Sequence, residues 1–357
     1  MGAPMIAKKQ KSKLPCLSFT SDRRFGIELE VNAFDGKNRP DNGQKVAGID
    51  FVGQYVARNS SEGVDIRDWQ HTDANDVWVV KPDSSCGMEV CTPIMKGWVG
   101  LKRVCEVVHA MAVEPKIKID QRCSVHVHVE VADLTQEQLA SVIAYWFKVE
   151  PVFMDSVPPS RKRNRYCQLM GMTNLLQHDT KITPQDLIRK IGNVKYYSLN
   201  TNQMMKNGRK TVEFRIVEGE GCKDPYLIKN WTRLLIHFVE MAKSLPFPKE
   251  YKEDDPWTSF SWLDPEDVFR LLGFSNNPQL YELSPGLTQT RNWFLARLQR
   301  HICRDTESNN FRCYALAELE QMLTRFREEG VDICAAEHLL PCEDKLKVVL
   351  YNEETKS

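Results

Sequence analysis

The chain has 357 residues, of which 42% are hydrophobic and 27% are charged, a composition that excludes a fully disordered protein. Lysine plus arginine balances aspartate plus glutamate, 48 against 48, which excludes a chain-wide basic surface for nucleic acid and leaves a local basic groove open. No apolar run approaches the roughly 20 residues of a membrane-spanning helix, so we expect no membrane partner. The length favours two domains.

The eleven cysteines have no CxxC spacing, which argues against a zinc ribbon. The first residues lack the apolar run of a secretory signal peptide, so we expect reduced, mostly buried thiols in a cytoplasmic protein. Residues 1–22 contain a short run of lysines without apolar periodicity. We expect a disordered basic tail there, and an arm that touches nucleic acid is the alternative.

Strand and helix patterns are mixed along the first two thirds of the chain. Alternating or short apolar runs predict strands over 25–32, 77–80, 88–91, 125–131, 196–199 and 211–217. Apolar residues at helical spacing predict helices over 97–112, 135–149, 187–191 and 231–239. The prolines at 151, 158 and 159 are expected to bracket a loop, and the polar, glycine-rich stretch 35–76 to form an insertion or lid.

Beyond residue 247 the pattern becomes helical, with Asp264 and Pro265 as a helix start and amphipathic stretches over 290–303 and 315–328. Before that point strands and helices do not alternate regularly, so an α+β fold is favoured over a doubly wound sheet. We therefore expect a catalytic domain over 23–247 and a helical C-terminal extension over 248–357.

Three predicted strands carry polar side chains at alternate positions, which point to one face: Glu28 and Glu30, His126 and His128, Glu213 and Arg215. Each pair alone is typical of a solvent-facing strand, a satisfied histidine or a cross-strand ion pair. Together, carboxylates gathered in one cavity repel one another and need a cation. Carboxylates with an occasional histidine suit Mg²⁺ or Mn²⁺ better than zinc.

Arginines supply the complementary charge. Arg161, Arg163 and Arg165 lie in one short segment, whose alternative interpretation is a solvated basic loop. The planar guanidinium matches phosphate oxygens, and metal ions beside arginines are what phosphoryl transfer requires. No GxxxxGK[ST] or GxGxxG motif is present, which argues against a P-loop or Rossmann nucleotide site.

The ordered motifs GIELEVN, WVVKPDSSCGMEVCTP, CSVHVHV, the arginine segment ending in Tyr-Cys, and TVEFR resemble the amidoligase family over roughly residues 23–245. These are carboxylate–amine ligases with a glutamine synthetase-like fold. The resemblance implies a curved, mainly antiparallel sheet with packed helices around a cavity for ATP and divalent metal. It also implies that ATP converts a carboxylate into an acyl phosphate, which an amine then attacks to form an amide.

The resemblance also implies roles for individual residues. Metal ligands would be Glu28, Glu30, Glu89, Glu213 and one of His126 and His128, with His128 favoured. Asp83 and Ser84 would lie near substrate or phosphate, while Arg161, Arg165 and Arg215 would hold the transferred phosphoryl group, with Glu213 beside them. The chain departs from the family at Ser124, where glycine is usual, and at Glu218, whose loop is therefore expected to face a different substrate.

Two other classes of function compete. His126, His128 and a carboxylate could form the facial triad of a metal-dependent hydrolase or oxygenase that uses no ATP. The second competing class is a catalytically inactive binding module whose helical C-terminus docks a partner. The acid and the amine are not readable from the sequence. The basic segments would suit a nucleic acid or modified nucleotide as substrate, and an oligomer stays open.

Overall fold

The computed structural model describes residues 16–17, 22–33, 47–60, 63–66, 76–162, 164–170, 182–191, 195–205, 210–248, 260–274, 282–302 and 316–331. Its main feature is a nine-stranded sheet. Seven of the strands follow the order β3-β4-β5-β2-β8-β10-β9, and the other two, β6 and β7, each pair with β2. Within the described part of this sheet, every pairing except β3 with β4 is antiparallel. The predicted α+β class with a mainly antiparallel sheet is therefore confirmed.

The strands of the main sheet are β2 (Arg24–Ala33), β3 (Val64–Ile66), β4 (Trp78–Pro82), β5 (Met88–Cys91), β6 (Met95–Lys96), β7 (Ile117–Lys118), β8 (Ser124–Glu130), β9 (Leu199–Asn200) and β10 (Thr211–Glu218). A separate parallel pair joins β1 (Cys16–Leu17) to β11 (Glu282–Leu283). Strand β1 thus lies within the segment expected to be a tail, and the rest of residues 1–21 is outside the described residues.

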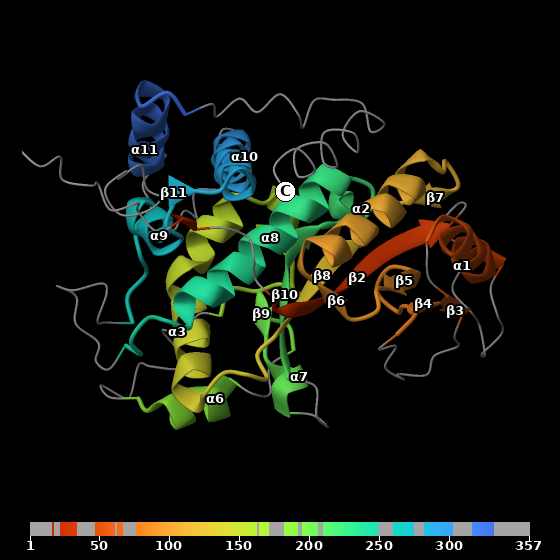
Figure 1. The fold of residues 1–357 in the computed structure, drawn as a ribbon, viewed down its shortest axis with the longest axis horizontal. Helices are drawn as coiled ribbons and strands as arrows, with labels where there is room; N and C mark the ends of the chain where they lie inside the picture. Colours follow the sequence, from red (N-terminus) through yellow and green to blue (C-terminus); the bar gives the residue numbers. More distant parts are fainter. Residues whose placement is uncertain are drawn as a thin grey trace, which may run out of the picture.

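The helices are α1 (Ala47–Asn59), α2 (Gly97–Val113), α3 (Gln136–Asp155), α4 (Pro159–Lys162), α6 (Pro184–Ile191), α7 (Asn202–Met205), the 3-10 turn η1 (Gly219–Cys222), α8 (Pro225–Ala242), α9 (Pro265–Leu271), α10 (Pro285–Ile302) and α11 (Leu316–Glu328). Helices α2 and α8 lie across one face of the sheet, with α3 beside α8 (Figure 1). Among the described residues, no helix is both long and apolar enough to span a bilayer.

Side-chain alternation along β2 decides what each face of the sheet carries. Ile27, Leu29 and Val31 are fully or almost fully buried in the hydrophobic core. Because successive side chains on a strand point to opposite faces, Glu28 and Glu30 project to the other side. Strand β8 repeats the pattern with its valines in the core and its histidines opposite, so the sheet has one apolar and one ionisable face.

Strand β10 carries an irregularity at Arg215. Its pairing with β8 runs from Phe214 opposite Val127 to Val217 opposite Val125, so β10 holds one extra residue. Such a bulge bends the strand and re-aims a side chain. The Arg215 amide donates to Ser198 O over 2.9 Å, and its carbonyl accepts from the Arg161 guanidinium, so the bulge leaves both of these backbone groups satisfied.

Two local expectations were wrong. Helix α3 continues through Pro151 to Asp155 instead of ending near 149, because its C-terminal half is packed in the core, where Trp146 and Phe153 stack edge to face at 5.0 Å. Residues 47–59 and 64–66, within the stretch expected to be a polar insertion or lid, form α1 and β3. Ile49, Val52 and Val56 of α1 are buried, a helical spacing that the polar residues around it obscured.

The C-terminal helices are joined to the sheet layer by buried polar contacts. Lys229 of α8 donates to Gln289 of α10 over 2.7 Å, and Arg297 of α10 forms a buried ion pair with Glu218 at the end of β10. The predicted helical character of this region is confirmed for residues 265–271, 285–302 and 316–328. The boundary between two domains near residue 247 stays a prediction.

Arg297→Ala is expected to lower the free energy of unfolding by about 3–5 kcal/mol, because it leaves the Glu218 carboxylate buried without its partner. Chemical denaturation measures this. Arg325→Ala is the matched control, since Arg325 and Glu266 form a pair in which both side chains are more than 40% exposed, worth less than about 1 kcal/mol. Equal effects of the two substitutions would show that α10 is not anchored through Glu218.

Candidate active site

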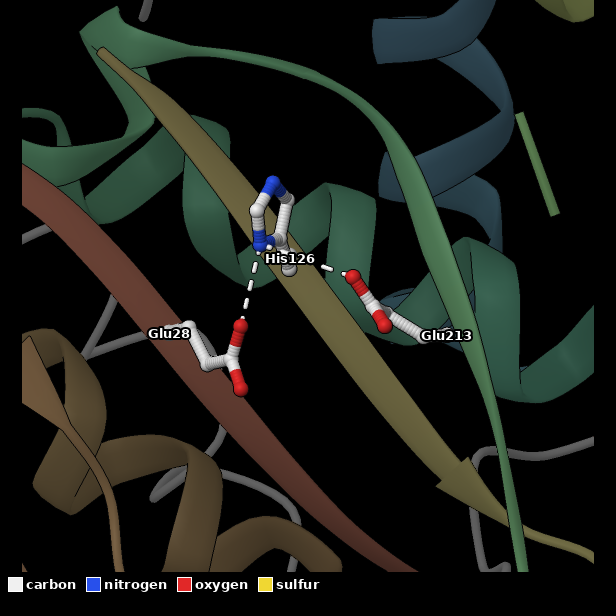
Figure 2. Close-up of side chains that lie close together, drawn as sticks. All are labelled: Glu28, His126 and Glu213. Carbon is white, nitrogen blue, oxygen red and sulfur yellow. Dashed lines mark hydrogen bonds and ion pairs between the residues drawn. The ribbon is translucent and has the colours of Figure 1, made fainter. Parts of the chain in front are cut away.

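The sheet register brings the ionisable side chains of three neighbouring strands together. Glu28 of β2 lies opposite His126 of β8, and His128 lies opposite Glu213 of β10. Figure 2 shows the result: His126 Nδ1 is 3.0 Å from Glu28 Oε2 and 3.6 Å from Glu213 Oε1. One ligand atom from each of these three residues lies within 4.8 Å of the others, a spacing that a single cation can bridge.

Glu28 binds both histidines. Its Oε1 atom is 3.0 Å from His128 Nε2, while its Oε2 atom bonds His126. Burial would raise the pKa of Glu28, but the charge of His128 and the hydrogen bond from His126 lower it well below its ordinary value of 4.5. Burial lowers the pKa of His128 and Glu28 raises it more strongly, to about 9. Glu28 is therefore ionised and His128 protonated near neutral pH.

Glu30 is the centre of a second group. Ser124 Oγ donates to Glu30 Oε2 over 2.7 Å and lies 3.1 Å from His126 Nε2. Ser124, the departure from the family pattern, thus supplies a hydrogen bond between two site residues. Glu30, Asp83 and Cys86 each place a ligand atom within 4.8 Å of the others.

The turn after β4 fixes Asp83. Its carboxylate accepts from the amides of Ser85 over 2.7 Å and Cys86 over 3.2 Å, and these bonds lower its pKa although burial opposes them. Gly87 ends the turn at φ +147°, and a Cβ there would lie 2.4 Å from Asn32 Oδ1, so the position requires glycine. Ser84, expected near phosphate, is exposed on this turn.

A third group surrounds Glu89, which lies opposite Glu30 on β2 and opposite Lys81 on β4. Lys81 Nζ is 3.2 Å from Glu89 Oε1, and Cys91 donates to the same carboxylate over 2.8 Å. Burial and the charge of Glu28 raise the pKa of Glu89 to about 7, against the opposing effect of Lys81. Sequence reasoning missed Lys81, because only the strand register shows that it meets Glu89.

Arg215 and Asn200 hold Glu213 in place. Arg215 pairs with Glu213 Oε1, and Asn200 Nδ2 donates to Oε2 over 2.6 Å. The Arg215 Nε atom donates to the Tyr166 carbonyl over 3.1 Å. Asn200 was also missed, since its strand has only two residues and carries no periodicity.

The other arginines are placed differently from one another. Arg161 is 3% exposed and donates to the Arg215 carbonyl, so it supports the bulge from within the protein. Arg165 is exposed and stacks on Tyr166, while Arg163 lies outside the described residues. Glu218, which begins the loop expected to face a different substrate, is itself 2% exposed and paired with Arg297.

The donor set fits a hard divalent cation. Carboxylates from β2, β5 and β10 converge with one imidazole, and such oxygen-rich sets are those that Mg²⁺ and Mn²⁺ prefer. Cys86, Cys91, Cys105, Cys123, Cys167 and Cys222 are free, and all of these except Cys91 are buried, as expected. Two of them, Cys86 and Cys91, stand at the edge of the cluster.

A family model described as "Putative amidoligase enzyme" matches residues 21–239, which contain every residue of the cluster. The chain belongs to this amidoligase family. Membership supports an amide-bond-forming ligase as the class of enzyme. Among curated proteins, none matches the chain.

Three solved structures resemble this amidoligase at low sequence identity. A bifunctional glutathione synthetase from Pasteurella multocida has a TM-score of 0.36 at 9% identity, with 92% of this chain and 52% of that chain covered. A glutamate–cysteine ligase from Francisella tularensis in complex with AMP has a TM-score of 0.36 at 11% identity, with 94% of this chain and 88% of that chain covered. The ligase PafA in complex with the prokaryotic ubiquitin-like protein Pup has a TM-score of 0.30 at 11% identity, with 89% of this chain and 65% of that chain covered. The chain thus spans about half the length of the first.

Proposed function

We propose that the protein joins a carboxylate to an amine at the expense of ATP, through an acyl-phosphate intermediate. The observation that carries this proposal is the convergence of Glu28, His126 and Glu213 beside Arg215, which combines a cation site with a guanidinium fork. Anionic metal ligands next to an arginine are suited to binding and neutralising phosphate oxygens.

The reaction follows from the weakness of a carboxylate as an electrophile. A carboxylate oxygen attacks the γ-phosphorus of ATP, the bond to the bridging oxygen of ADP breaks, and an acyl phosphate forms. The amine nitrogen then attacks the acyl carbon, phosphate leaves and a proton is lost. Arg215 holds the transferred phosphoryl group, and the Arg161 contact keeps the bulge that aims Arg215.

Residues of four strands would hold Mg²⁺ or Mn²⁺: Glu28, Glu30, Glu89, Glu213 and one histidine. We assign His126 as that histidine in place of His128, because His126 lies in the three-residue donor group and His128 is the charged partner of Glu28. The cation would neutralise the phosphate oxygens of ATP. The acid and amine substrates stay open, with a nucleic acid or modified nucleotide among the candidates.

Hydroxylamine in place of the amine tests the reaction without knowledge of the natural amine. The protein is incubated with ATP, Mg²⁺ and a panel of carboxylic acids, and hydroxamate and ADP are measured together. We expect equal amounts of both with at least one class of acid. ADP formed at the same rate without any acid would contradict the proposal, and so would tightly bound iron with oxygen consumption, which favours the facial-triad alternative.

Metal affinity is expected to rise with pH between about 6 and 9. A cation requires deprotonated ligands and is repelled by a charged imidazole. The pKa of Glu89 is about 7 and that of His128 about 9, so raising the pH first frees Glu89 and then discharges His128. We expect affinity for Mn²⁺ to increase up to about tenfold per unit of pH below 7 and less steeply above it, measured by titration calorimetry.

Two variants assign the lower step of this pH dependence. Glu89→Gln is expected to remove it. Lys81→Met is expected to move it to higher pH, because Lys81 lowers the pKa of Glu89. An affinity that does not change between pH 6 and 9 in the unsubstituted protein would show that neither Glu89 nor His128 acts on a bound metal ion.

A further inference from the structure

An aromatic pair made of the exposed Tyr196 and the half-buried Tyr166 lies next to Arg215, the arginine of the proposed phosphate site. Tyr196 is 47% exposed, and its ring centroid is 5.4 Å from that of Tyr166, with the two planes at 64°. The Arg165 guanidinium lies 4.7 Å from the Tyr166 ring centroid and donates to the Tyr166 hydroxyl over 2.6 Å. Tyr166 and Tyr196 thus form an aromatic corner, with a positive charge at its side.

The backbone holds this corner in a fixed position. Gln168 N donates to Tyr196 O over 2.9 Å, and Ser198 N donates to Gln168 O over 2.7 Å. These bonds form a parallel bridge between Gln168 and Tyr197. The backbone around the two rings is therefore ordered without a ligand, so binding costs less conformational entropy.

Two hydrogen bonds connect the corner to the catalytic strand. Arg215 Nε donates to the Tyr166 carbonyl over 3.1 Å, and the Arg215 amide donates to Ser198 O over 2.9 Å. Tyr196 precedes Ser198 by two residues, which span at most roughly 7 Å of chain. A ligand that combines a planar base with a phosphate chain can therefore contact the tyrosines and Arg215 together.

We propose that Tyr196 and Tyr166 form the stacking platform for the adenine of ATP. The inference rests on the proposed function, because it names the part of the ATP molecule that the phosphate site leaves unbound. Stacking on an aromatic ring uses the π-face that every nucleobase offers, and a guanidinium adds a cation–π contact. In this arrangement the Arg165 guanidinium would supply the cation–π contact to the adenine.

The experiment compares two ligands that share the phosphate chain. Titration calorimetry measures binding of ATP and of inorganic tripolyphosphate, each with Mg²⁺, to the full chain and to Tyr196→Ala. We expect Tyr196→Ala to weaken ATP binding roughly fivefold to hundredfold and to leave tripolyphosphate binding unchanged. Tyr196→Trp is expected to keep ATP affinity. Trp262→Ala is the matched control, since Trp262 is another exposed aromatic, 38% exposed, next to Phe147.

The experiment distinguishes failure of the proposed function from failure of the adenine platform alone. If the unsubstituted protein binds neither ligand, the proposed function fails and this inference with it. If the protein binds both ligands and Tyr196→Ala weakens neither, the platform alone is wrong. If Tyr196→Ala weakens binding of a single-stranded oligothymidine and leaves ATP binding unchanged, the corner binds a nucleic-acid substrate and the adenine assignment is overturned.

Discussion

Glu28→Ala is expected to lower metal-dependent ATP turnover at least about 100-fold. Glu28 belongs to two of the three donor groups, one with His126 and Glu213 and one with Glu89 and Cys91. Its two oxygens also bind both imidazoles. Removing the carboxylate therefore takes away a metal ligand and leaves the buried His126 and the half-buried His128 without their shared partner. Turnover is followed by ADP release, and metal affinity by titration calorimetry.

Two further variants make the Glu28 result interpretable. Glu28→Gln keeps the size of the side chain and removes only its charge, so loss of metal binding with an unchanged circular dichroism spectrum separates chemistry from folding. Glu130→Gln is the control, because Glu130 lies on β8, the strand next to β2, but pairs with Arg24 outside the cluster. Wild-type metal affinity in both Glu28 variants would show that the metal site is elsewhere.

Arg215→Lys is expected to lower turnover about 100- to 1000-fold while the chain still folds. The Arg215 guanidinium reaches Glu213 and the Tyr166 carbonyl with different nitrogens. A lysine ammonium is a single point charge and cannot bridge these two groups while also holding a phosphate oxygen. The loss should appear in kcat more than in the KM for ATP, because the contact strengthens as charge develops on the phosphoryl group.

Arg24→Lys is the matched control for Arg215→Lys. Arg24 lies on β2 of the same sheet, and its pair with Glu130 leaves the Arg24 side chain 54% exposed, so the same chemical change is expected to leave turnover unchanged. Full activity in Arg215→Lys would remove Arg215 from the mechanism, and the proposal would then lack its phosphate-binding group.

The sequence predicted the central strands because their patterns are local. In GIELEVN and SVHVHV, each apolar residue faces the core and each ionisable residue faces the opposite side, so period-two alternation alone identifies both faces. The long helices over α2 and α8 were predicted for the same reason, with their buried residues at helical spacing.

The missed features depend on tertiary structure. Lys81 joins the site only because β4 pairs with β5 in a register that sets it opposite Glu89. In the sequence, Arg161 resembles a solvent-facing or phosphate-binding residue because it lies in a run of arginines. In the structure it is buried and donates to the carbonyl of Arg215, at the bulge of β10. Pro151 is tolerated because core packing of the surrounding helix outweighs the backbone preference.

The central claim is that the cluster on β2, β8 and β10 binds ATP through a divalent cation. The most direct test is the thermal unfolding midpoint with ATP, with and without Mg²⁺, for the unsubstituted protein and for Glu28→Ala. A ligand that binds only the folded state raises this midpoint. We predict a rise of a few degrees that requires both ATP and Mg²⁺ and is absent in Glu28→Ala. An equal rise in Glu28→Ala, or none in the unsubstituted protein at millimolar ATP and Mg²⁺, would contradict the claim.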